Sequence, residues 1–223
     1  MNRNTWIIFG VVCIAILGGL VALSRQSSVD VSSIDETKFI AANDANGNIA
    51  DHTIGNKESK TLLIEYGDFQ CPACQSAYPN IKELVEEFQD DILFIFRNNP
   101  ITQIHPNARA GSAAAEAAGL QDKYWEMHDM LYEKQSDWSQ ASSSERLSIF
   151  EGYAKEIDVK DIDKFKSDME SSAVNNKINF DLALGKKVPV TGTPTILLNG
   201  EKIESDVWGS KDKFKSAIEN ALN

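Results

Sequence analysis

Apolar residues form one long run near the N-terminus, and shorter patterned groups occupy the rest of the 223 residues. The run covers residues 6–23 and contains no charged side chain. As a helix it would rise about 27 Å, which approaches the roughly 30 Å hydrocarbon thickness of a bilayer. We therefore interpret residues 1–25 as a short cytoplasmic stub and a single transmembrane anchor. An N-terminal signal peptide is the alternative, although its apolar stretch is usually shorter.

The composition changes after this run. Residues 26–50 carry many Ser, Asp and Asn side chains and few large apolar ones, so we predict a linker there. Residues 51–223 are strongly patterned and are numerous enough for one domain with a full hydrophobic core.

Strand and helix patterns alternate at the start of this domain. Short β-type runs at 61–66 and 92–96 flank a stripe of apolar positions at helical spacing over 71–88. A strand–helix–strand unit of this kind has a right-handed crossover. The next part is predicted to be helical throughout. Its helices are expected at 107–120, at 124–134, after a Ser142–Glu145 capping box, at 162–169 and at 174–185.

β-type residues return near the C-terminus. Runs at 195–198 and 202–203 flank Asn199-Gly200, a pair typical of a tight hairpin turn. A last amphipathic helix extends to Leu222. The predicted order is therefore strand–helix–strand, a helical block, and strand–strand–helix.

The charge balance narrows the possible partners. The chain has a formal net charge of −11, and without the two arginines that flank the apolar run the charge of residues 26–223 is −13. This acidity disfavours nucleic acid and anionic lipid as partners, because both would repel the domain.

Two of the three cysteines, Cys71 and Cys74, are separated only by Pro72 and Ala73, and the third, Cys13, lies in the apolar run. Two thiols at this spacing can close and reopen a disulfide. At a helix start the first thiol faces unpaired N–H groups, which favour a thiolate. Half of a zinc site and a permanent structural disulfide remain as alternatives. Zinc would need two more ligands from only three histidines, and so short a loop gains little from a permanent crosslink.

From about residue 51 to the C-terminus, the chain resembles the DsbA-like branch of the thioredoxin-fold thiol–disulfide oxidoreductases. The resemblance implies an α/β thioredoxin fold with an inserted helical domain at about 100–187, preceded by the single N-terminal transmembrane helix. The motifs that carry it are 64–74, 104–108, 125–128 and 191–195.

The resemblance also implies roles for individual residues. Cys71 is the expected nucleophile, and Cys74 is the resolving thiol. Thr193-Pro194 matches the cis-proline loop of the family, which lies beside the attacking sulfur and presents backbone groups to an extended substrate. Glu65 occupies a position where related proteins carry a buried acid, so it is our candidate proton acceptor for Cys74. A solvent-facing strand residue is the alternative for Glu65.

Magnitudes limit how oxidising the pair can be. Lowering a thiol pKa from about 8.5 to about 3.5 corresponds to roughly 7 kcal/mol, whereas a helix terminus supplies about 0.3–2 kcal/mol. The best-known DsbA-like motif has His where this chain has Ala73, and the acidic Asp68 lies close by. We therefore predict a thiolate less stabilised than the DsbA extreme. We interpret His105 and His128 as structural or surface residues.

The sequence thus predicts an extracytoplasmic, membrane-tethered dithiol oxidase that introduces disulfide bonds into reduced, unfolded exported proteins. The resemblance implies reoxidation by a membrane quinone-linked oxidase of the DsbB or vitamin-K-epoxide-reductase type. We expect a monomer with a redox-active disulfide, no metal or organic cofactor, and no nucleic-acid partner. Two alternatives stay open: a reductase or isomerase of the same fold, and a peptide-binding module without catalysis.

Overall fold

The computed structural model describes residue 9, residues 12–14 and residues 29–223. The chain divides into two compact units, Met1–Asp30 and Val31–Asn223. In the first unit residue 9 and residues 12–14 are helical, and residues 29–30 belong to no helix or strand. The predicted transmembrane anchor lies largely outside the described residues and stays a prediction. Within the described part of the chain, no helix combines the length and hydropathy that a membrane span requires.

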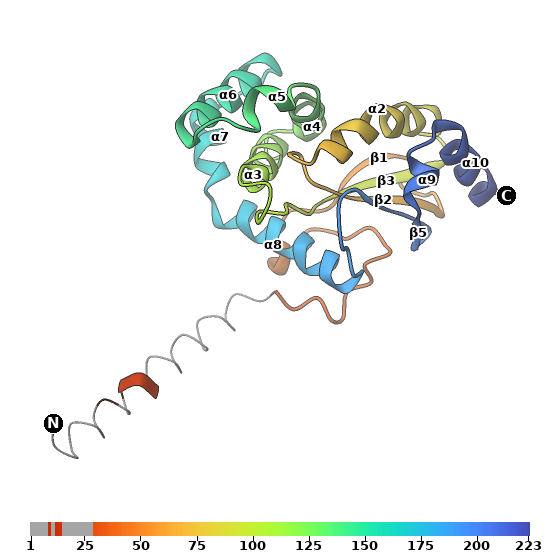
Figure 1. Cartoon of the computed structure of the whole chain (residues 1–223), viewed down its shortest axis with the longest axis horizontal. Helices are drawn as coiled ribbons and strands as arrows, with labels where there is room; N and C mark the ends of the chain where they lie inside the picture. The colour runs from red at the N-terminus through yellow and green to blue at the C-terminus, as the bar shows by residue number, and fades with distance from the viewer. Residues whose placement is uncertain (1–8, 10–11, 15–28) are drawn as a thin grey trace. The chain divides into compact units, whose positions relative to one another are not determined.

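A five-stranded mixed sheet forms the centre of the second unit (Figure 1). The two central strands, β2 and β3, run parallel, and all other neighbours are antiparallel. Both central strands are almost continuously buried, because helices cover both of their faces. In spatial order the strands are β1 (His52–Gly55), β3 (Ile92–Asn98), β2 (Thr61–Gly67), β4 (Thr195–Leu198) and β5 (Glu201–Ile203).

The two faces of the sheet carry different helices (Figure 1). Helix α2 (Pro72–Glu87) joins β2 to β3, and α10 (Lys211–Leu222) packs beside it in the same apolar cluster. Helix α8 (Ser172–Lys187) lies against β3 on the opposite face. Because side chains alternate along a strand, Leu63 of β2 joins the cluster under α2.

The remaining helices form a block beside the sheet, as predicted for an inserted helical domain (Figure 1). The capping box of Ser142 and Glu145 is present at the start of one of them. The predicted insertion at 100–187 also takes in α8, but this helix covers the sheet itself. The block comprises α3 (Ala108–Gly119), α4 (Tyr124–Glu133), α5 (Gln135–Trp138), α6 (Ser143–Glu156) and α7 (Ile162–Met169).

The predicted linker at 26–50 is wrong from Val31 onward, because residues 31–50 belong to the folded unit. A short 3-10 helix, η1 (Asp44–Asn46), contacts α8. This segment is ordered because Arg97 of β3 is fully buried and its guanidinium needs hydrogen-bond acceptors. Its Nη2 donates to the Lys38 carbonyl at 2.7 Å, so the segment is held by a contact with no local sequence signal.

Buried charges tie this segment to both β3 and α8. Arg97 Nη2 lies 2.8 Å from Asp51 Oδ2, and Lys177 Nζ lies 3.2 Å from Asp51 Oδ1. Lys177 also pairs with Asp181 at 2.7 Å. All four side chains are almost fully excluded from solvent. Removing one partner of such a network would leave an uncompensated buried charge, which costs about 3–5 kcal/mol.

Two further elements were not predicted. Strand β1 is a partly exposed edge strand that pairs with β3, and helix α9 (Ser205–Trp208) has only one turn. The predicted hairpin between β4 and β5 is confirmed. Asn199 and Gly200 have φ values of 51° and 86°, the left-handed conformation that this tight turn requires at both positions.

Candidate active site

Cys71 lies at the N-cap position of α2, and Pro72 is the first helical residue. Proline fits there because a first-turn N–H has no partner within the helix. The Cys71 backbone N–H donates to the Asp68 carbonyl at 3.0 Å, which fixes the turn into the helix. The sulfur accepts hydrogen bonds from the backbone N–H groups of Ala73 and Cys74. The predicted position of the first thiol at the helix start is therefore observed.

These surroundings lower the pKa of the Cys71 thiol from 9.0 to about 5. The main cause is a hydrogen bond donated by the Cys74 thiol, and partial burial opposes it. The Thr193 side chain lowers this pKa further, although its buried hydroxyl group makes no hydrogen bond of ordinary geometry within residues 29–223. A pKa near 5 makes about 99% of Cys71 a thiolate at pH 7.

Cys74 differs sharply from Cys71. It is fully buried, and desolvation raises its pKa well above 9.0, with further contributions from Cys71 and Glu65. Cys71 is 7% exposed, less than an attacking sulfur at a free helix end was expected to be. Because Cys74 has no exposure, an incoming sulfur can still reach only Cys71. Both cysteines are free thiols in this structure.

The loop before β4 covers the sulfur and accounts for this low exposure. The Thr193-Pro194 peptide bond is cis, as the resemblance implied. The Thr193 carbonyl oxygen lies 3.3 Å from Cys71 Sγ. The Thr195 hydroxyl donates to the Gly192 carbonyl at 2.8 Å and holds the loop where β4 begins. Backbone groups are therefore presented directly beside the reactive sulfur.

Glu65 lies in the middle of β2, and only 3% of it is exposed. The alternative interpretation of a solvent-facing residue is therefore wrong. Desolvation raises the Glu65 pKa from 4.5 to about 8, and the negative charge of Cys71 adds to this effect. A cavity of about 70 Å³ touches Glu65 and also the partly exposed Lys82, and it has room for a few water molecules. The role of Glu65 as a proton acceptor stays a prediction.

The carboxylate of the acidic Asp68 is occupied by hydrogen-bond donors other than the two cysteines. It is fully buried, and its Oδ2 accepts hydrogen bonds from the Ile101 backbone N–H at 2.9 Å and from His105 Nδ1 at 2.8 Å. His105 thus has the structural role expected of it. His128 is also buried, and burial lowers its pKa. Its ring lies edge-on to Phe96, inside the aromatic core.

Side-chain amides join the loop before Cys71 to the helical block, and sequence reasoning missed them. Gln135 of α5 donates from Nε2 to the carbonyls of Phe69 and Cys71 at 2.8 Å and 3.2 Å. Gln70 accepts a hydrogen bond from the Asn107 backbone N–H at 2.6 Å. Nothing in the local sequence distinguishes these amides from surface glutamines, because their partners are distant in the chain.

The zinc alternative has no geometric support. Among residue 9, residues 12–14 and residues 29–223, no three His, Cys, Asp or Glu side chains are arranged to hold a metal ion. The arrangement that is present, an ionised thiol beside a buried neutral thiol and a buried acid, is suited to thiol–disulfide exchange.

Comparison with solved structures identifies DsbA-type proteins with the same fold. BdbD from Bacillus subtilis in its oxidised form has a TM-score of 0.67 and 23% identity, covering 83% of this chain and 98% of that one. The thiol–disulfide exchange protein α-DsbA2 from Wolbachia pipientis has a TM-score of 0.64 and 20% identity, covering 76% and 86%. These likenesses show a thioredoxin-like α/β fold with a helical insertion.

Curated proteins with similar sequences are named as Na(+)/H(+) antiporters and not as thiol–disulfide proteins. Na(+)/H(+) antiporter NhaA 1 of Salinispora arenicola is 36% identical over 152 residues, and the match covers 68% of this chain and 22% of the antiporter. The corresponding protein of Mycolicibacterium vanbaalenii is 35% identical over 154 residues, covering 67% and 23%. The chain thus spans about a fifth of the length of these relatives.

A family model described as thioredoxin matches residues 47–220, which include every site residue above. The chain therefore belongs to the thioredoxin family.

Proposed function

We propose that this protein is an extracytoplasmic dithiol oxidase that forms disulfide bonds in reduced, unfolded exported proteins. The observation that carries the proposal is the asymmetry of the pair: Cys71 keeps 7% exposure and has a pKa of about 5, whereas Cys74 has no exposure and a raised pKa. A stabilised Cys71 thiolate favours the reduced pair. The oxidised pair is correspondingly a stronger oxidant, and Cys71 is a good leaving group.

Substrate oxidation takes two exchange steps. A substrate thiolate attacks Cys71 Sγ of the enzyme disulfide, a new S–S bond forms, and Cys74 leaves with the electron pair of the broken bond. Cys74 then takes a proton, because its pKa is high, and Glu65 can donate it, since burial raises the Glu65 pKa and favours its protonated form. A second substrate thiolate attacks the substrate sulfur of the mixed disulfide and releases Cys71 as a thiolate.

Reoxidation of the enzyme uses Cys71, Cys74 and Glu65 in the reverse direction. The Cys71 thiolate attacks a disulfide of the reoxidant, and Cys74 resolves the mixed disulfide after passing its proton to Glu65. In the mixed disulfide Cys71 carries no charge, so one of the two causes that raise the Glu65 pKa is absent and Glu65 ionises more readily. Glu65 is thus an acid in one half of the cycle and a base in the other.

The partner and the location belong to the same proposal. We assign reoxidation to a membrane quinone-linked oxidase of the DsbB or vitamin-K-epoxide-reductase type, with the protein held at the membrane by residues 1–25. Anchoring confines both proteins to one surface and raises their effective concentration. No metal or organic cofactor is needed, because the Cys71–Cys74 disulfide carries the two electrons.

The test is the oxidation of a reduced, unfolded protein by the full chain in its oxidised form. Cys71→Ser should abolish disulfide formation. Cys74→Ser should accumulate a mixed disulfide between Cys71 and the substrate, visible by non-reducing electrophoresis. Cys13→Ser is the matched control and should oxidise substrate at the normal rate. If Cys71→Ser oxidised the substrate at the normal rate, the proposed function would be wrong.

The alternatives give other outcomes. A reductase would show an equilibrium with glutathione that favours the oxidised Cys71–Cys74 pair, and an isomerase would rearrange the disulfides of a fully oxidised, mispaired substrate. A peptide-binding module would bind unfolded polypeptide equally well after both cysteines are replaced, and it would leave reduced substrate unchanged.

A further inference from the structure

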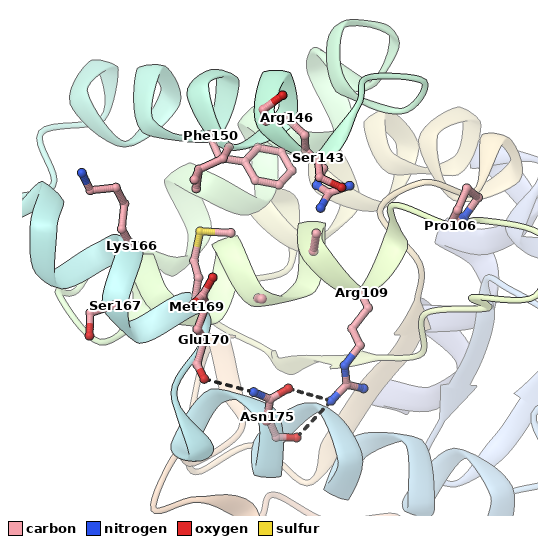
Figure 2. Close-up of a pocket in the computed structure, with 14 residues that line it drawn as sticks. Pro106, Arg109, Ser143, Arg146, Phe150, Lys166, Ser167, Met169, Glu170 and Asn175 are labelled. Atoms are coloured by element: carbon pink, nitrogen blue, oxygen red, sulfur yellow. Dashed lines mark hydrogen bonds between the residues drawn. The ribbon is translucent and has the colours of Figure 1, made fainter.

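Two arginines of this acidic domain line one groove. Residues 26–223 contain only three arginines, and Arg97 is buried in the charge network below β3. The other two, Arg109 of α3 and Arg146 of α6, line a groove of about 880 Å³ in the helical block (Figure 2). Most of the surface of a domain with this charge repels anions, so the arginines make the groove locally distinct.

Neither arginine pairs with an acid. Arg109 Nη2 donates to Oδ1 of Asn175 at 3.0 Å and of Asn179 at 2.9 Å, and Arg146 donates to Asn107 Oδ1. Within residues 29–223, their hydrogen-bond partners are neutral amide groups, and no carboxylate lies within ion-pair distance of either guanidinium. Burial lowers the pKa of both side chains, because less water stabilises the cations. A carboxylate that entered the groove would supply the missing counter-charge.

The rest of the groove suits a peptide rather than a single ion. Leu147 of α6, which is 39% exposed, and Met169 of α7 line the same groove as Arg109. One acid, Glu170, lines the groove, and Lys166 is already paired with Asp163 at 2.9 Å. The volume is in the range typical of ligand-binding clefts, about 300–1,000 Å³. Apolar and cationic walls together fit a segment that carries both apolar and acidic side chains.

The groove also leads toward the reactive sulfur. Arg109 is shared with a second depression of about 350 Å³, whose lining includes Thr191 and Gly192. These residues directly precede Thr193, whose carbonyl oxygen lies 3.3 Å from Cys71 Sγ. A polypeptide bound at Cys71 and extended along the cis-proline loop would therefore reach Arg109 first.

We propose that the groove binds an acidic, extended segment of the polypeptide that is being oxidised, with Arg109 and Arg146 pairing with its carboxylates. This inference rests on the proposed function and adds a substrate preference to it. The groove takes no part in the exchange steps. It raises the local concentration of cysteines that have acidic residues on one side, and it leaves the chemistry at Cys71 unchanged.

The test uses two reduced dithiol peptides, identical except that one has four acidic residues beside its cysteines and the other has four neutral ones. The oxidised full chain should oxidise the acidic peptide about tenfold faster at low salt, since a tenfold preference needs only about 1.4 kcal/mol. The double variant Arg109→Gln/Arg146→Gln should lose this preference and oxidise the neutral peptide at the normal rate. The double variant Arg109→Lys/Arg146→Lys should retain most of the preference.

A matched control separates the groove from general electrostatics. Lys57→Gln/Lys202→Gln changes the net charge equally at exposed positions on the β1–β2 loop and on β5, and it should keep the preference. If both glutamine pairs lost the preference equally, or if the unmodified protein had none, the inference would be wrong. Competition by acetate equal to that by a cysteine-free acidic peptide would identify a simple anion site and would also overturn it. Failure to oxidise the neutral peptide would instead refute the proposed function.

Discussion

The burial of Glu65 has a cost in stability that can be measured. Its pKa is about 8 in the folded, reduced protein and about 4.5 in an unfolded chain. The folded protein therefore holds the Glu65 proton more tightly than the unfolded chain does, and raising the pH through this window favours unfolding. Glu65→Gln replaces the acid by a neutral side chain of nearly the same shape, so this pH-dependent penalty disappears.

The magnitude follows from the two pKa values. Proton linkage gives a penalty close to zero at pH 4, about 1 kcal/mol at pH 5, about 3 kcal/mol at pH 7 and about 5 kcal/mol at pH 9. From pH 4 to pH 7 the ratio of the unfolding equilibrium constants, unmodified protein over variant, should therefore rise more than 100-fold. The new amide can also change the free energy of unfolding by an amount that is the same at every pH. Such a change does not affect this result, because the comparison uses only the variation of the free energy with pH.

The assay is denaturant unfolding of the reduced protein at several pH values between 4 and 9. Glu58→Gln is the matched control, because Glu58 is exposed on the loop after β1, and its unfolding curve should follow that of the unmodified protein at every pH. In a Cys71→Ser background the effect of Glu65→Gln should shrink, since the Cys71 charge is the second cause of the raised pKa.

Parallel stability curves for the unmodified protein and Glu65→Gln across the whole pH range would refute this reasoning. They would mean that Glu65 titrates as an ordinary carboxyl group. It would then be ionised at neutral pH and could not donate a proton to Cys74 during substrate oxidation.

Three other substitutions test separate parts of the site and fold. Ala73→His places a second donor beside the Cys71 thiolate, so the pair should become more oxidising against glutathione; an unchanged equilibrium constant would contradict this. Thr193→Val removes a hydroxyl donor, and the Cys71 pKa should rise by about 1–2 units in an alkylation titration, since a hydrogen bond to a charged group contributes about 1.5–3 kcal/mol. Arg97→Met leaves the buried Asp51 with Lys177 as its remaining ionic partner and should destabilise the fold by about 3–5 kcal/mol in guanidinium unfolding, whereas no loss would show that the network is dispensable.

Elements with a strong local signal could be predicted from the sequence. The β-type runs at 61–66 and 92–96 correspond to β2 and β3, and the Asn199-Gly200 turn has the expected backbone conformation. Pro72 marks the start of α2 because the missing N–H of a proline costs no hydrogen bond in the first helical turn. In each case neighbouring residues determine the structure.

The incorrect predictions concern residues whose partners are distant in the sequence. Residues 31–50 resemble a linker in composition. They are ordered because the buried Arg97 of β3 donates hydrogen bonds to backbone carbonyls of this segment. Strand β1 is short and partly exposed, so its sequence shows little alternation of apolar and polar residues. Its pairing with β3 is what defines it as a strand.

The candidate site shows the same division. The Cys71–Cys74 spacing and the helix start were evident in the sequence. The largest cause of the low Cys71 pKa, the hydrogen bond from Cys74, depends on side-chain geometry that spacing alone does not determine. The burial of Glu65 and the support from Gln135 depend on the packing of α2 and α5, which lie far apart in the chain.

The central claim is that Cys71 is an ionised thiol at neutral pH, and its titration tests this most directly. The measurement is the rate of alkylation of Cys71 by iodoacetamide as a function of pH, in reduced Cys13→Ser protein so that only the active-site pair is present. The account predicts a half-maximal rate near pH 5, because iodoacetamide reacts with the thiolate. A midpoint near the ordinary thiol value of about 8.5 would contradict it.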